Sequence, residues 1–118
     1  MTARELRIGN YINPKFPMQV VNIFPDEVNA DFEGNEGDVF EFKNEDIEGI
    51  PIDEYWLLRW KFKRQPWGLV RGRFLFKDGL NNRHKKLTME ILSGFRIEVE
   101  FIHELQNLYF SLTGEELE

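Results

Sequence analysis

The feature that most constrains this chain is a set of short runs in which apolar and polar residues alternate. Residues 18–24 are rich in valine and isoleucine, residues 28–32 alternate regularly, and residues 39–43 form a further run. Successive side chains of a β-strand point to opposite faces, so this period predicts strands with one buried face. Because turn residues separate the runs, we expect a small antiparallel sheet or barrel of short strands over residues 1–52.

The same period returns between residues 67 and 101, where we expect a three-stranded antiparallel meander with one apolar face. In its first strand, Val70, Phe74 and Phe76 are predicted to point toward the core. The alternation then predicts an outward face on which basic residues of the first strand lie beside glutamates of the last: Arg71, Arg73, Lys77, Glu98 and Glu100.

Two segments have helical spacing instead. The first begins near Asp53, a residue suited to cap a helix, contains two of the three tryptophans, and is expected to end at Pro66. The second covers residues 102–113, where leucines and a tyrosine recur at intervals of three and four. Gly114 is a suitable stop, and we expect this amphipathic helix to cover the apolar face of the meander.

These elements predict an α+β fold in a single domain of 118 residues. We expect an N-terminal β lobe over residues 1–52, and a second lobe over residues 53–118 that holds the Trp-rich helix, the meander and the C-terminal helix. The composition, 42% hydrophobic and 14% aromatic, can supply a core and is unlike that of a disordered chain. No apolar run approaches the roughly 20 residues of a membrane span, so we expect a cytoplasmic protein without membrane contact.

Charge is segregated along the chain. Residues 26–54 carry twelve acidic side chains and one basic one, whereas residues 55–86 carry ten basic side chains and one acidic one. Residues 87–118 are acidic again, and the net charge of the chain is −6. Such blocks predict either a bipolar surface or two elements that neutralise each other, and they favour self-association or a charged partner.

Most catalytic and metal-binding chemistries lack their residues here. The chain has no cysteine, which excludes disulfides and thiolate metal sites. His84 and His103 are far apart and lack the paired spacing of metal ligands, and neither Ser93 nor Ser111 lies in a nucleophile motif. No glycine-rich phosphate loop is present. We therefore expect a protein that is not an enzyme and that uses no cofactor or metal.

The segment from 55 to 77 combines aromatic and basic residues, a pairing typical of nucleic-acid-binding surfaces. Its spacing also points several of its aromatic rings into a core, and cross-strand ion pairs could neutralise its charges. Both interpretations stay open. The candidate nucleic-acid contacts are Arg59, Lys61, Lys63, Arg64, Trp67, Arg71 and Arg73.

Three segments resemble a group of small proteins from Bacteroidetes genomes and their prophages or mobile elements. They are LRIGNYI at residues 6–12, IPIDEYWLL at residues 50–58 and HELQNLYFSLTGEEL at residues 103–117. The chain departs from the group at Asp53, where the group tends to have threonine, although both residues cap helices. The resemblance implies a bacterial or phage cytoplasmic protein, and it implies no activity and no functional residues.

Our hypothesis from the sequence is a non-enzymatic accessory or protein-interaction protein of a bacterial or prophage setting. Its partner would be an unknown protein or a second copy, held by surplus aromatic residues such as Phe16, Trp67 and Tyr109. The alternative is a nucleic-acid-binding module that uses the basic-aromatic segment.

Overall fold

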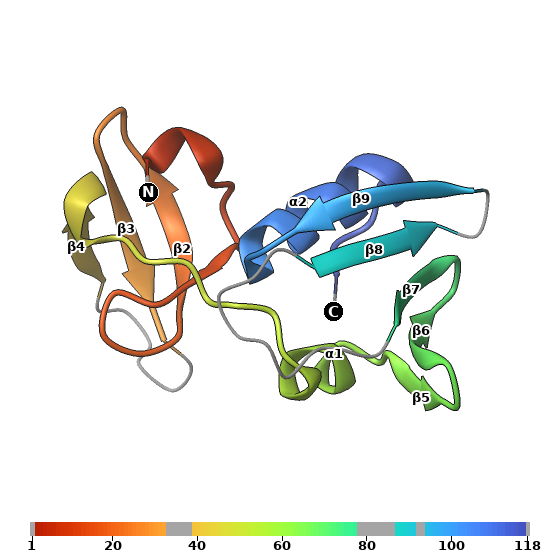
Figure 1. Cartoon of the computed structure of the whole chain (residues 1–118). Helices are drawn as coiled ribbons and strands as arrows, with labels where there is room; N and C mark the ends of the chain where they lie inside the picture. Colours follow the sequence, from red (N-terminus) through yellow and green to blue (C-terminus); the bar gives the residue numbers. More distant parts are fainter. Residues whose placement is uncertain (1, 33–38, 78–86, 92–93, 118) are drawn as a thin grey trace. The chain divides into compact units, whose positions relative to one another are not determined.

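The computed structural model of the chain describes residues 2–32, 39–77, 87–91 and 94–117. The chain divides into two compact units, Met1–Ile50 (unit 1) and Pro51–Glu118 (unit 2). The fold is α+β, with an antiparallel sheet of four strands in unit 1 and one of five strands in unit 2 (Figure 1).

In unit 1 the strands follow one another in chain order: β1 (Tyr11–Ile12), β2 (Met18–Ile23), β3 (Glu27–Asp31) and β4 (Phe40–Lys43). Short 3-10 helices, η1 (Ala3–Glu5) and η2 (Asn44–Asp46), flank the sheet. Among the described residues β1 and β4 do not pair with each other, so the sheet is open and no barrel closes. The expected small sheet is confirmed, and its barrel alternative is not.

The alternation predicted for unit 1 decides which side chains form its core. Met18 and Val20 of β2 and Val28 and Ala30 of β3 are all buried. The register shifts between Val20 and Asn22, which marks a β-bulge. Residues from the N-terminal segment, β1 and the stretch after β4 complete the cluster: Ala3, Leu6, Ile12 and Ile47.

Unit 2 opens with the predicted helix, which is shorter than expected. Helix α1 covers Glu54–Arg59, and the carboxylate of Asp53 accepts a hydrogen bond of 3.0 Å from the backbone N–H of Trp56. The helix ends at Trp60 rather than at Pro66, so that prediction is wrong. Lys61 turns left-handed with φ 65°, and the Phe62 N–H donates to the Leu57 carbonyl at 2.9 Å, which closes a Schellman motif.

The sheet of unit 2 has five strands where the sequence predicted three. They are β5 (Lys63–Gln65), β6 (Gly68–Arg71), β7 (Phe74–Lys77), β8 (Leu87–Ile91) and β9 (Phe95–Val99). The segment predicted as one strand folds back on itself at Gly72-Arg73, because Gly72 adopts φ 58° there. Strand β5 is formed by residues that the helical spacing had assigned to the preceding helix.

This hairpin also overturns the predicted faces. Arg71 pairs directly with Phe74 across the turn, so the two side chains lie on the same face of the sheet. Leu69 pairs with Phe76, so Leu69 and not Val70 shares the buried face with Phe76. On the other face of this sheet the Glu90 carboxylate lies 3.2 Å from both Lys77 and Arg96.

Helix α2 (Ile102–Thr113) packs against the buried face of this sheet. Leu105 and Tyr109 are buried, and the Tyr109 ring lies 5.2 Å from the ring of Phe74. The helix begins where the Glu104 carboxylate accepts a hydrogen bond of 2.9 Å from the Phe101 N–H. It ends at Gly114 with φ 75°, as predicted.

Candidate binding pocket

A pocket of about 660 Å³ opens in unit 2 where the sheet continues past the last turn of α2. A volume of this size lies within the range of ligand-binding clefts. Its walls come from the β6–β7 hairpin, the ends of β8 and β9, and the last turns of α2. Parts of unit 2 that are distant in sequence therefore build it jointly.

The floor of the pocket is one cross-strand row of four side chains. Arg71 pairs with Phe74, Phe74 with Ile91, and Ile91 with Phe95, so the four residues line up across β6 to β9. Neighbouring strands lie about 4.8 Å apart, which makes the row roughly 14 Å long. It is cationic at the Arg71 end and apolar along the rest.

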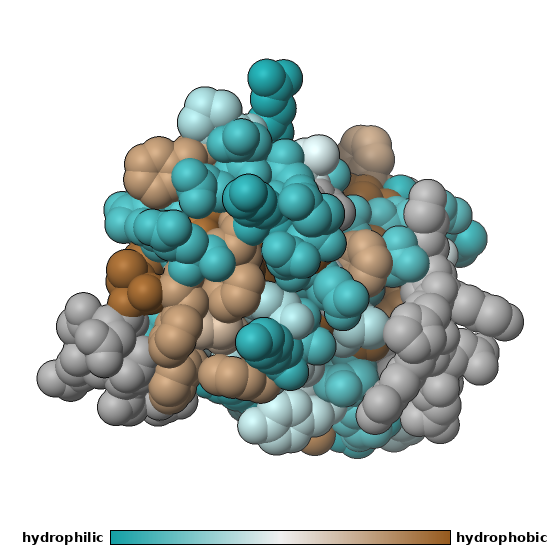
Figure 2. Space-filling view, turned by 90° about the vertical axis from the view of Figure 1, so that its left-hand side faces the viewer, coloured by the Kyte–Doolittle hydropathy of each residue, from teal (hydrophilic) through white to brown (hydrophobic). Residues whose placement is uncertain are grey.

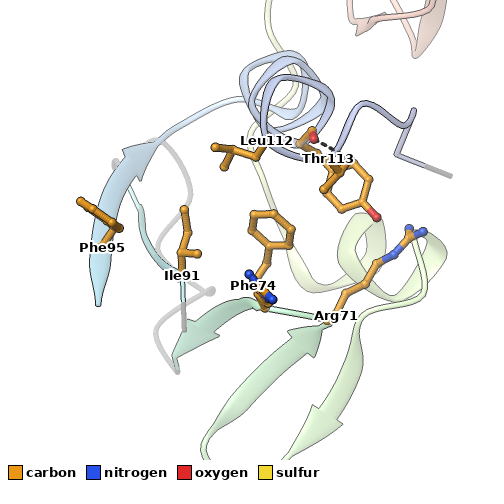
Figure 3. A pocket seen from close by; sticks show the side chains of 9 residues that line it. Arg71, Phe74, Ile91, Phe95, Leu112 and Thr113 are labelled. Atoms are coloured by element: carbon orange, nitrogen blue, oxygen red, sulfur yellow. Dashed lines mark hydrogen bonds between the residues drawn. The ribbon is translucent and has the colours of Figure 1, made fainter. Parts of the chain in front are cut away.

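The wall opposite this floor belongs to α2. Figure 3 shows Phe74 and Ile91 projecting from their strands toward Leu112, with Phe95 at one side of the opening and Arg71 at the other. Thr113 also lines the pocket, but its hydroxyl donates to the Tyr109 carbonyl at 2.8 Å. Thr113 therefore secures the helix end, and the wall offered by Leu112 is apolar.

Contacts with Trp60 and Tyr109 help to hold the guanidinium of Arg71 in place. One nitrogen, Nη1, donates to the Trp60 carbonyl at 2.8 Å, and the guanidinium carbon lies 5.1 Å from the centre of the Tyr109 ring. These contacts hold the guanidinium of Arg71 at one end of the pocket floor.

Arg73 adds a second positive charge from the turn of the same hairpin. Its side chain is exposed, and it lines the pocket together with Gly72. The exposed guanidinium of Arg73, at one end of an apolar floor, suits an anionic group on a ligand, since arginine presents several N–H donors to a carboxylate or phosphate.

The opposite end of the pocket is open to solvent. Phe95 is 67% exposed and Leu112 is 51% exposed. Isolated apolar residues are common on protein surfaces, but here both lie at one apolar opening. The pocket is thus a groove with solvent-exposed anchors and not an enclosed chamber.

The structure separates most of the basic residues that the sequence had grouped. Arg71 and Arg73 line the pocket, whereas Lys63 pairs with Val70, the neighbour of Arg71, and so lies on the other face of the sheet. The Arg64 guanidinium lies 2.7 Å from the Glu54 carboxylate. This ion pair joins the acidic and basic blocks of the sequence.

The remaining members of that set lie around α1 and β5. The Arg59 guanidinium stacks over the Trp56 ring at 4.9 Å, and Lys61 is exposed after the helix end. Trp67 is exposed in the turn before β6, whereas Tyr109, expected as a surface anchor, is buried. The expectation of an exposed Tyr109 is therefore wrong.

Sequence reasoning missed three apolar members of the pocket: Ile91, Phe95 and Leu112. Each sits in a regular pattern that reads as an ordinary core position, and only the strand register and the helix end bring them together. The available signal was the Gly72-Arg73 pair, which marks a turn and reverses the face assigned to Arg71.

Histidine and acidic side chains lie scattered over the described ranges. No group of three or more histidine, aspartate or glutamate side chains is placed there to hold a metal ion. His103 is buried with its ring stacked on Phe101 at 5.7 Å, and His84 lies outside the described residues. No helix in those ranges is long and apolar enough to cross a membrane.

No protein-family model, no curated protein and no solved structure matches the chain.

Proposed function

We propose that this chain is a non-enzymatic interaction protein that binds a short segment of a partner protein in the pocket of unit 2. An apolar side chain of the partner would lie on the row of Phe74, Ile91 and Phe95, and an acidic group would meet the exposed Arg73. The observation that carries this proposal is the row itself, which joins a cationic end to an apolar floor.

The openness of the pocket favours a protein segment over an enclosed small molecule. Small-molecule sites bury most of the surface of their ligand, which requires walls that surround it. Here Phe95 and Leu112 are half-exposed or more at the opening. A bound polypeptide would cover these two residues from outside while one of its side chains fills the groove.

The residue types also suit protein recognition. Aromatic residues and arginine contribute most of the energy at many protein interfaces, particularly where neighbouring contacts exclude water. Phe95 and Arg73 offer these two chemistries at opposite ends of the row. We expect the partner to act in the bacterial or prophage setting that the sequence resemblance implies.

Nucleic-acid binding remains the second candidate, and the exposed ring of Trp67 favours it. A base could stack on this ring, with exposed Lys63 close in sequence to meet a phosphate. All three tryptophans lie in unit 2, so their fluorescence can be followed while single-stranded and duplex oligonucleotides are added. Quenching that weakens steeply with salt would support this candidate over the pocket.

The pocket proposal can be tested with a library of random dodecapeptides displayed on phage and selected against the full chain. An extended peptide rises about 3.3 Å per residue, so a row of roughly 14 Å spans about four residues. We expect enriched peptides to carry an aspartate or glutamate within about four residues of a large apolar side chain.

Two matched pairs of variants then locate the binding site of a synthetic enriched peptide. Leu112→Asp places a charge at the pocket, and Leu58→Asp makes the same change at a leucine of similar exposure, 48% against 51%, on α1. Arg73→Glu is compared with Lys63→Glu in the same way. We expect Leu112→Asp and Arg73→Glu to raise the dissociation constant at least about tenfold, which is the effect of losing one strong contact. The controls Leu58→Asp and Lys63→Glu should leave the dissociation constant unchanged.

Fluorescence anisotropy of the labelled peptide measures each dissociation constant. Equal binding by Leu112→Asp and Leu58→Asp would refute the proposal, as would a selection that enriches nothing or enriches peptides without acidic residues.

A further inference from the structure

Unit 1 carries a second apolar surface, which is independent of the pocket. The rings of Phe16 and Phe32 meet edge to face with centres 5.2 Å apart, and those of Phe32 and Phe40 stack at 6.0 Å. These three rings form what we call the aromatic patch, and the exposed Val39 directly precedes Phe40 in the sequence. Figure 2 shows apolar residues interrupting the hydrophilic surface on the side of the molecule that carries the strands of unit 1.

The aromatic patch is exposed although its rings contact one another. Phe16 is 45% exposed and Phe40 is 44% exposed, and Val39 is exposed as well. Burying such a ring fully would remove a large apolar area from water, which is energetically favourable. Rings left exposed in a folded chain therefore retain free energy that a binding partner could gain by covering them. A contiguous group of exposed apolar residues is a mark of an interaction surface.

The scaffold beneath the aromatic patch holds its rings in a preformed arrangement. Phe32 packs against the core cluster of unit 1, and Phe40 pairs with the buried Ala30 in the sheet. Phe16 lies in the β1–β2 loop between two prolines, which restrict the backbone. Binding of a partner here would therefore cost little conformational entropy in these side chains, because they are already ordered.

The charge of the unit indicates what kind of partner fits. Residues 1–50 carry eleven acidic and four basic side chains. Such a field attracts cations and repels polyanions, which argues against a nucleic acid at this surface. The faces of aromatic rings also attract guanidinium and ammonium groups.

We infer that the aromatic patch is a docking surface for a segment of a protein partner that carries arginine or lysine beside apolar side chains. The cations would lie over the exposed faces of Phe16 and Phe40, and the apolar side chains would cover Val39 and the edge of Phe32. The charge preference is opposite to that of the pocket in unit 2, which selects acidic segments.

The test uses the same random dodecapeptide library, selected against the full chain with the Leu112→Asp substitution that disables the pocket. We expect the enriched peptides to be net positive and to contain arginine with large apolar residues. Because the selection is made in this background, its result does not depend on whether the pocket proposal holds.

A matched pair of variants assigns the binding to the aromatic patch. Phe16→Ser removes one of the three rings, and Phe24→Ser removes a phenylalanine of the same unit and the same exposure, 45%, that follows β2. A second variant, Phe40→Ser, repeats the test on another element. We expect Phe16→Ser and Phe40→Ser each to weaken an enriched synthetic peptide at least about fivefold, the scale of a lost aromatic and cation–π contact.

Anisotropy of the labelled peptide, with circular dichroism as a check of folding, gives the result. Equal binding by Phe16→Ser and Phe24→Ser would overturn the inference, and so would enrichment of neutral or acidic peptides or of none. If Phe16→Ser fails to fold, Phe40→Ser decides the question by the same criterion.

Discussion

The two units differ in how the apolar face of the sheet is covered. In unit 2, α2 lies on the buried face of a five-stranded sheet, and the apolar surface that the helix leaves uncovered is the pocket with its arginines. Unit 1 has no α-helix in its described residues, and its core extends through Phe32 to the aromatic patch. Unit 2 thus exposes apolar surface where its covering helix ends, and unit 1 exposes it at the margin of its core.

Charge separates the units further. Residues 1–50 carry eleven acidic and four basic side chains, whereas residues 51–118 carry ten acidic and eleven basic ones. Two apolar surfaces of similar kind therefore lie in units of different net charge, which is why we propose different partners for them. The excess of acidic charge therefore lies mainly in unit 1, whereas the charges of unit 2 nearly cancel.

The largest loss of stability is expected from adding a side chain at Gly68, in the sheet of unit 2. Gly68 adopts φ 147°, and a Cβ there would lie 2.1 Å from the Phe76 carbonyl oxygen, a backbone atom that cannot move aside. We expect Gly68→Ala to destabilise the unit by about 3–5 kcal/mol, among the severest effects of single substitutions. Denaturation followed by tryptophan fluorescence measures it, since all the tryptophans lie in unit 2.

Gly72→Ala is the matched control in the same hairpin. Its φ of 58° is also left-handed, but a Cβ there would meet nothing within 4 Å. The cost should be only that of the backbone conformation, about 1–2 kcal/mol. Equal losses for the two alanine variants would show that steric contact with β7 is not what requires glycine at position 68.

The next prediction concerns the core of unit 1. Ile12 is fully buried and Ile8 is 63% exposed, although both are isoleucines near the start of the chain. Ile12→Ala should cost about 2–5 kcal/mol because it leaves a cavity, and Ile8→Ala less than about 0.5 kcal/mol. Amide hydrogen exchange of β2 and β3 reports the loss within unit 1. Similar protection in both variants would contradict the assigned core.

The sequence predicted the fold class and most of the strands, because a two-residue period indicates a sheet wherever one face is buried. It failed between residues 67 and 77. A two-residue turn pairs the residue before it with the residue after it, and here it pairs Arg71 with Phe74. Paired residues lie on the same face of the sheet. The face that holds odd-numbered residues before the turn therefore holds even-numbered residues after it. A continuous strand through Gly72 would keep one parity and assign Arg71 to the wrong face.

The candidate pocket was less predictable than the fold. Arg71 and Arg73 were singled out by their charge, but the reason given was a nucleic-acid surface shared with Lys63. Ile91 and Phe95 are joined to them by cross-strand register, and Leu112 by the position at which α2 ends. Neither relation is visible in a linear sequence whose local pattern gives each residue an ordinary core role.

A smaller effect distinguishes the two arginines of the pocket. Arg71 donates to the Trp60 carbonyl and lies over Tyr109, so Arg71→Ala should cost about 1–2 kcal/mol of stability. Arg73 is exposed in a turn, and Arg73→Ala should change stability by less than about 0.5 kcal/mol. Tryptophan-monitored denaturation measures both. If both variants are equally stable, Arg71 is not the structural anchor of the groove.

The smallest predicted change is a gain in stability at the end of α1. Lys61 occupies the left-handed position of a Schellman motif, which helices usually give to glycine because a Cβ is strained there. Lys61→Gly should relieve that strain and raise stability by up to about 1 kcal/mol, although part of the gain is offset by the greater freedom of glycine in the unfolded chain.

Lys63→Gly provides the contrast, since Lys63 is an exposed residue of β5, where glycine weakens a strand. The two glycine variants remove the same charge two residues apart, so the difference between them reports mainly on backbone conformation. Thermal unfolding followed by tryptophan fluorescence should show a higher midpoint for Lys61→Gly and a lower one for Lys63→Gly. A loss of stability in both would mean that the Lys61 side chain contributes more to unit 2 than its strained backbone costs.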